Sequence, residues 1–162
     1  MKRIHIVGRK NSGKTTLVVE IVEELVRRGM KVGTIKHTPH THELDVPGKD
    51  SHRHRVAGGF PAAIVAKDLT AVFTPTDPDS NYYEVLERHF ENCDLVIVEG
   101  DIESPEPKIE VWRQDTGTVP IVHERGDIHA VVTDDEIVTA VPVWGREDIG
   151  AICDKILAIK RG

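Results

Sequence analysis

The chain contains little cysteine. Cys93 and Cys153 are the only two in 162 residues, and neither belongs to a C-x-x-C pair. Two cysteines are too few for a disulfide framework, and without a closely spaced pair they indicate neither a zinc module nor a redox site. We therefore expect both side chains to be buried free thiols.

Long apolar runs are also missing. No segment approaches the ~20 consecutive apolar residues that a membrane-spanning helix needs. The apolar stretch at residues 4–7 follows two basic residues, but it is too short for a secretory signal and runs directly into a glycine-rich segment. It predicts a first β-strand. We expect a cytoplasmic protein with no membrane partner.

Positive charge is in deficit. The net charge of −6 disfavours general nucleic-acid binding, because that function takes a basic surface. The hydrophobic fraction of 39% and the charged fraction of 30% are typical of globular proteins. The sequence shows no internal repeat, low-complexity tract or linker, and its length predicts one domain over residues 1–162.

Against these absences stands one strong motif, a phosphate-binding loop. Residues 8–15 read G-R-K-N-S-G-K-T, which matches the pattern G-x-x-x-x-G-K-T. The glycines let backbone N–H groups close around an anion, and the N-terminus of the following helix adds positive charge. Lys14 is expected to reach the terminal phosphates, and Thr15 to ligate Mg²⁺. The predicted nucleotide contacts are Gly8, Arg9, Lys10, Asn11, Ser12, Gly13, Lys14, Thr15 and Thr16.

A strand–helix–strand pattern surrounds this loop. Apolar residues recur at helical spacing over residues 17–26, Gly29 is placed to end that helix, and residues 31–37 read as a second strand. Two strands joined by a helix in this way lie parallel. We predict an α/β protein with the three-layer fold of phosphate-loop NTPases and a mainly parallel sheet.

The remaining elements are predicted from shorter patterns. Residues 61–66 and 70–74 indicate a β-hairpin, attached at the edge of the sheet. Residues 108–113 alternate by side and predict a strand. Further strands are expected at 94–99, 119–122 and 129–133, and further helices at 50–56, from a cap at Asp79 and Ser80 to Phe90, and at 147–160.

A long polar segment, residues 38–55, follows the second strand. It leaves the sheet at the edge where open α/β proteins bind ligands. The spacing His37-x-x-His40-x-His42 offers ligands for a transition metal. The alternative is a loop that uses histidine for hydrogen bonds and substrate contacts. We favour the alternative, because no cysteine accompanies the histidines and their spacing fits no defined zinc module.

A phosphate-loop NTPase also needs a carboxylate near the phosphates. Residues 94–100 read D-L-V-I-V-E-G, and the four apolar residues indicate a strand covered on both faces. Asp94 and Glu99 lie about 16 Å apart along that strand, so only one can serve. Glu99 lies at the carboxyl end, the correct edge, and we assign the Mg²⁺ contact and a catalytic role to it, with Lys14. Asp134 and Asp135 end a later strand, where a base could be read, but an acidic turn is an equal alternative.

Three segments resemble the molybdopterin-guanine dinucleotide biosynthesis adapter family, the MobB proteins. They are the phosphate loop, K-H at 36–37 with P-G-K-D-S at 47–51, and D-L-V-I-V-E-G with the K-I that follows at 108–109. The first is shared with very many NTPases, and the second is far more specific. The acidic run before Pro47 is shorter here than in related sequences.

The resemblance implies a GTP-binding protein with weak GTP hydrolysis, usually a homodimer, that uses Mg²⁺. It implies a partner, the MobA-like molybdopterin guanylyltransferase, which joins GMP to molybdopterin. Contacts to the γ-phosphate or the pterin would come from Lys36, His37 and Lys49. Asp45 or Asp50 would approach the metal, and Lys108 would contact an anion. The preference for GTP comes from the resemblance alone, since no N-K-x-D motif is present.

Hydrolysis is expected to be slow, because the sequence identifies no arginine finger and no water-positioning glutamine. Two other function classes remain open at this point. One is a small-molecule kinase that uses the polar segment as its acceptor site. The other is a metallochaperone GTPase, which the histidines would favour.

Overall fold

The computed structural model describes residues 2–77 and 81–159 of the chain. The chain divides into two compact units. The first, here called the sheet unit, comprises Met1–Pro39 and His89–Gly162. The second, here called the insert unit, comprises His40–Arg88. That the two units form one domain stays a prediction.

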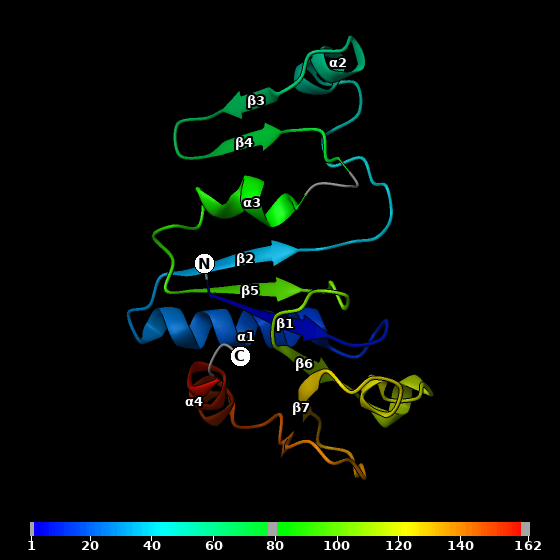
Figure 1. The fold of residues 1–162 in the computed structure, drawn as a ribbon. Helices are drawn as coiled ribbons and strands as arrows, with labels where there is room; N and C mark the ends of the chain where they lie inside the picture. The colour runs from blue at the N-terminus through cyan, green and yellow to red at the C-terminus, as the bar shows by residue number, and fades with distance from the viewer. Residues whose placement is uncertain (1, 78–80, 160–162) are drawn as a thin grey trace. The chain divides into compact units, whose positions relative to one another are not determined.

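The sheet unit is built on a six-stranded sheet in the order β2-β5-β1-β6-β7-β8. Every neighbouring pair in it is parallel, which confirms the predicted strand direction. All carboxyl ends therefore lie at one edge (Figure 1). The strands are β1 (Arg3–Val7), β2 (Val32–Lys36), β5 (Leu95–Glu99), β6 (Lys108–Val111), β7 (Ile128–Val132) and β8 (Val143–Trp144).

Helices α1 (Lys14–Arg27) and α4 (Ile149–Ala158) lie side by side on one face of this sheet (Figure 1). The main core cluster joins Ile4 and Ile6 of β1 to apolar side chains of both helices. Val7 points to the other face, where it meets Ile121 and Ile128 in a second cluster. This alternation is what a central strand requires, because successive side chains point to opposite faces.

Strand β6 confirms the strand predicted within residues 108–113, although it ends at Val111. All four of its residues are buried, the two charged ones included. Its two charged side chains are buried because each has partners: Lys108 Nζ lies 2.9 Å from Asp127 Oδ2, and the Glu110 carboxylate accepts two backbone N–H groups. The alternation of charged and apolar residues in β6 therefore belongs to a strand in the interior of the sheet.

The partners of Glu110 also explain a second correction. Residues 119–122 do not form a strand; a 3₁₀ helix, η2, covers Ile121–His123. The N–H groups of Ile121 and Val122 donate to Glu110 at 2.6 and 2.8 Å, which satisfies the orphan amides at the start of that turn. Burial raises the pKa of Glu110, and these two bonds act against that shift.

The insert unit contains α2 (Asp50–Val56), β3 (Ala62–Val65), β4 (Thr70–Phe73) and α3 (Tyr82–Glu87). The predicted hairpin is confirmed, since β3 and β4 are antiparallel. They form a separate two-stranded sheet, so the expected attachment at the edge of the large sheet is wrong. The predicted cap at Asp79 and Ser80 lies outside the described residues. Asn81 caps α3 by accepting the N–H of Tyr83.

Two absences in the sequence can be compared with the structure. Within the described part of the chain, no helix combines the length and apolar composition that crossing a bilayer takes. Both cysteines are free, as expected. Cys153 is buried, whereas Cys93 is only half-buried.

Candidate nucleotide-binding site

The phosphate loop has the backbone that its sequence demands. Gly8, Asn11 and Gly13 adopt positive φ angles of 149°, 64° and 94°. Any larger residue at position 8 would clash, because an added Cβ would lie 2.4 Å from the carbonyl oxygen of Val111 and 2.7 Å from Ser12 Oγ. Where the loop follows β1, it therefore packs directly against the carboxyl end of the neighbouring strand β6.

Lys14 bends back over this loop, where its Nζ donates to the carbonyl oxygen of Arg9 at 2.7 Å. Burial lowers the pKa of Lys14, and the nearby Glu99 carboxylate acts against that shift. Ser12 is 1% exposed, and its Oγ makes no hydrogen bond to any described residue. An ammonium group and a buried hydroxyl without a partner suit a site for phosphate oxygens.

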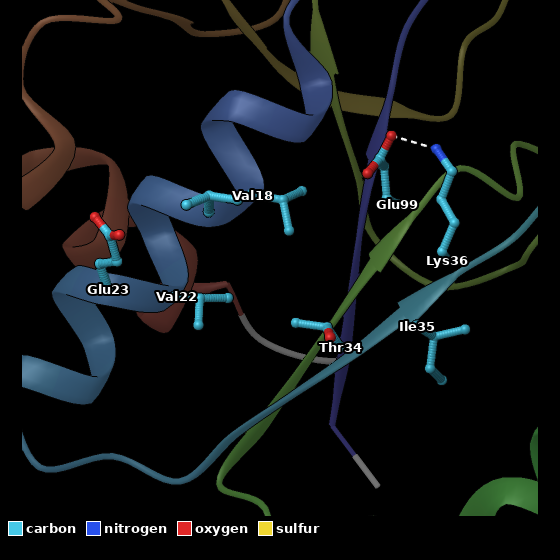
Figure 2. A pocket seen from close by; sticks show the side chains of 8 residues that line it. Val18, Val22, Glu23, Thr34, Ile35, Lys36 and Glu99 are labelled. Atoms are coloured by element: carbon cyan, nitrogen blue, oxygen red, sulfur yellow. Dashed lines mark hydrogen bonds and ion pairs between the residues drawn. The ribbon is translucent and has the colours of Figure 1, made fainter. Parts of the chain in front are cut away.

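Glu99 ends β5, which runs between β1 and β2. Its Oε1 accepts the Thr15 hydroxyl at 2.9 Å and also pairs with Lys36 Nζ. Figure 2 shows Lys36 reaching from β2 toward this carboxylate. Glu99 is 7% exposed, so the lysine compensates a nearly buried charge. A hydroxyl and a carboxylate beside a phosphate loop are ligands that fit Mg²⁺.

Asp94 lies at the opposite, amino end of β5. Its Oδ2 accepts the backbone N–H of Lys31 at 2.8 Å, which ties the start of β2 to the start of β5. Asp94 is therefore an anchor between strands, and Glu99 is the carboxylate at the phosphate loop.

His37 lies at the edge that carries Glu99. Its N–H donates to the carbonyl oxygen of Glu99 at 2.9 Å. Gly100 has a φ of 96°, and an added Cβ there would lie 3.0 Å from the His37 carbonyl oxygen. The chain after β2 therefore starts close against the end of β5, which fixes where the polar segment begins.

Lys108 does not join this group. It lies at the amino end of β6, is 1% exposed and pairs with Asp127. Hydrogen bonds from Arg125 and then Lys108 hold the pKa of Asp127 well below its usual range. The structure thus places Lys108 in a buried ion pair away from the phosphate loop.

The other expected ligands belong to the insert unit. Asp45 is engaged inside its own loop: Oδ1 accepts the N–H of Val46 at 2.7 Å, and Oδ2 lies 3.6 Å from Arg55. A hydrogen bond from Ser51 lowers the pKa of Asp45. Asp50 is largely exposed, 4.0 Å from Arg53. Lys49 precedes α2 as its N-cap residue.

The histidines of the polar segment do not form a metal centre in the structure. The rings of His40 and His42 meet edge to face at 6.1 Å, and His52 lies 3.4 Å from Glu43. Among the described residues, no group of three or more His, Cys, Asp or Glu side chains is arranged to hold an ion. That these histidines serve hydrogen bonds and substrate contacts stays a prediction.

Two cavities border the site, and neither follows from a motif. One of about 320 Å³ lies between α1 and β2, with apolar walls that include Val18, Val22 and Ile35, and reaches Glu99 (Figure 2). The other, of about 260 Å³, joins Lys10 and Asn11 of the loop to the segment after β6. The residues after β6 that line this second cavity belong to no recognisable sequence pattern, so the sequence does not reveal them as part of the site.

The family model described as molybdopterin guanine dinucleotide synthesis protein B, MobB, matches residues 3–134. The chain belongs to the MobB family. The matched segment contains the phosphate loop, Glu99 and the whole polar segment, whereas β8 and α4 follow it.

Two relatives carry the name molybdopterin-guanine dinucleotide biosynthesis adapter protein. The one from Haemophilus influenzae is 37% identical over 122 residues, which are 74% of this chain and 68% of that relative. The one from Escherichia coli is 32% identical over 155 residues, 90% and 86% of the two chains.

Solved MobB structures share the fold. A crystal structure of molybdopterin-guanine biosynthesis protein B superimposes with a TM-score of 0.76 at 26% identity and covers 96% of this chain and 98% of that one. A MobB homologue from Bacillus stearothermophilus gives 0.69, also at 26% identity, over 98% and 100%. These MobB structures confirm the α/β phosphate-loop fold that the sequence predicts.

Proposed function

We propose that this MobB protein binds GTP with Mg²⁺ and acts as an adapter in attaching GMP to molybdopterin. The observation that carries the proposal is the contact of Thr15 and Glu99 beside the phosphate loop, since it sets two oxygen ligands where a triphosphate's metal belongs. The adapter role is supported by the names of the two bacterial relatives.

Each part of the site has a role in this proposal. The backbone N–H groups of residues 8–16 would cradle the phosphates, and Lys14 would release Arg9 to neutralise the β- and γ-phosphates. Thr15 and Glu99 would hold the metal, which supplies charge neutralisation on the phosphates. Lys36 would then be free to contact the γ-phosphate or the pterin, together with His37 and Lys49.

Hydrolysis by this chain alone would be slow. Its single glutamine, Gln114, follows β6 in the 3₁₀ helix η1 (Gln114–Thr116), whereas Glu99 ends β5. Arg9 of the loop pairs with Glu124. An activating group would come from a second copy of the chain in a homodimer or from the MobA-like guanylyltransferase.

Nucleotide binding is tested by titrating GTP into the purified protein with and without Mg²⁺. Lys14→Ala should weaken GTP binding about 10-fold or more, because it removes a charged phosphate contact. Glu99→Gln should make the affinity insensitive to Mg²⁺, since the amide keeps the Thr15 contact but loses the charge. The matched control for Lys14→Ala is Lys31→Ala, which removes the same positive charge at the opposite edge of the sheet. Full Mg²⁺ dependence in Glu99→Gln would contradict the proposal.

The adapter role needs a separate measurement. Size-exclusion chromatography of this protein with a MobA-like guanylyltransferase should show a complex that depends on GTP and is lost with Lys14→Ala. Equal complex formation with and without nucleotide would argue against a GTP-controlled adapter.

A further inference from the structure

A cavity of about 320 Å³ lies at the carboxyl ends of β6 and β7, around the acidic pair Asp134 and Asp135 that the sequence offered as a possible base contact. Its volume is at the lower end of the range for small-molecule sites. Its walls include Trp112, Arg113, Thr133, Asp134, Asp135 and Arg146. All of these residues belong to the sheet unit, which also carries the phosphate loop.

This cavity adjoins a smaller cavity that borders the phosphate loop. Arg113 and Asp115 line both it and the smaller cavity that Lys10 and Asn11 border. In the sheet, β6 separates β1 from β7, so the end of β7 lies about 10 Å from the end of β1. A nucleotide whose phosphates lie on the loop would reach this far with its ribose and base together. The cavity is therefore where the base of a bound nucleotide would lie.

The carboxylates of the cavity are held in place by main-chain groups. Asp135 Oδ2 accepts the N–H of Gln114 at 2.8 Å, and its own N–H donates to the Thr133 hydroxyl at 3.0 Å. Asp134 Oδ1 accepts the N–H of Arg146 at 2.7 Å. Asp135 is thus tied to the segment after β6 that joins the two cavities, whereas Asp134 is tied to the side of β8.

We propose that this cavity binds the guanine base and that Asp135 reads its Watson–Crick edge. The proposal rests on the proposed nucleotide site. Guanine presents two neighbouring donors there, N1–H and the 2-amino group, and a carboxylate accepts both. Adenine presents an acceptor at N1, which a carboxylate repels. Asp135 therefore gives this chain a preference for guanine without an N-K-x-D motif.

Competition by base analogues tests this in the unmodified protein. Inosine triphosphate lacks the 2-amino group, so it should bind about 10-fold more weakly than GTP, and ATP more weakly still. Inorganic tripolyphosphate reports the phosphate loop alone. Equal affinity for GTP, inosine triphosphate and ATP would overturn the base assignment and leave the phosphate site standing. Absence of tripolyphosphate and GTP binding would overturn both proposals.

A substitution tests the assigned residue. Asp135→Asn keeps an oxygen for the N–H of Gln114 and turns an amide toward the base. It should weaken GTP binding about 10- to 100-fold and strengthen xanthosine triphosphate binding by a similar factor, because xanthine carries a carbonyl where guanine carries the amine. Tripolyphosphate binding should not change. Asp134→Asn is the matched control. The role of Asp135 would be overturned if the preference shifted from GTP to xanthosine triphosphate in Asp134→Asn, or if it shifted in neither variant.

Discussion

At the scale of single residues, the phosphate loop depends on one glycine more than on its other small residues. Gly8 combines a positive φ with a close approach to the Val111 carbonyl oxygen, and its neighbours there are backbone and a buried hydroxyl. Neither can move aside cheaply, since Val111 ends a strand that is buried on both faces. A residue larger than glycine at position 8 would therefore disturb both the loop conformation and the packing of β6 against it.

Three glycine substitutions distinguish the cost of backbone strain at a positive φ from the cost of a steric clash of the added Cβ. Gly126→Ala should be neutral, because its φ is not in the left-handed region and nothing lies within 4 Å of the added Cβ. Gly29→Ala should cost about 1 kcal/mol of unfolding free energy from backbone strain alone. Gly8→Ala should cost more than Gly29→Ala and abolish GTP binding. Urea unfolding and nucleotide titration measure the series, and equal costs at positions 8 and 29 would rule out the collision.

At the scale of elements, β6 is stabilised by partners that lie outside it. Lys108 and Glu110 are buried in the middle of the sheet, and both depend on the segment between β6 and β7. The sequence alone could not show this, because the charge pattern of residues 108–113 is the same for a half-exposed strand. The apolar run at 119–122 was misread for the same reason: a carboxylate 11 residues earlier turns it into η2.

The ion pair of β6 has a pH dependence that can be measured. Asp127→Asn leaves the buried Lys108 ammonium without its charged partner, so it should lower the unfolding free energy by about 1–2 kcal/mol at pH 7. The folded-state pKa of Asp127 is depressed, so its contribution is present above about pH 4 and is lost as the pH falls below that value. The difference between variant and unmodified protein should shrink accordingly. Urea unfolding at pH 7 and pH 3 checks it, with Asp115→Asn as an exposed control.

At the scale of the whole molecule, the sequence predicted the elements that follow from local patterns. It did not predict the contacts that depend on which strands are neighbours. Strand β1, the loop, α1 and β2 follow from one motif and one periodic segment. The pairing of Lys36 with Glu99 needs β2 and β5 to be neighbours, and nothing in either strand specifies that order. The cavity proposed to bind the base is lined by residues at the ends of three strands, β6, β7 and β8. One of these, β8, has only two residues, which is too short for a sequence pattern to reveal it.

The insert unit should be dispensable for folding and for phosphate binding. Both core clusters and the residues Lys14, Thr15 and Glu99 belong to the sheet unit. A glycine-serine linker of about 12 residues is long enough to run back along β2, which spans about 17 Å. Replacing residues 40–88 with it should keep a cooperative thermal transition and tripolyphosphate binding.

The same excision decides what the polar segment contributes. It removes Asp45, Lys49 and Asp50, so the nucleotide-dependent complex with the guanylyltransferase should be lost while binding to the loop persists. A matched chain that keeps residues 40–57 and replaces only the hairpin and α3 should retain the complex. If the excised protein fails to fold, the two units form one cooperative domain and the prediction of a single domain over residues 1–162 holds. If it folds and still forms the complex, Lys49 and the polar segment have no part in recognition, and the contact must come from the sheet edge that Lys36 and Glu99 share.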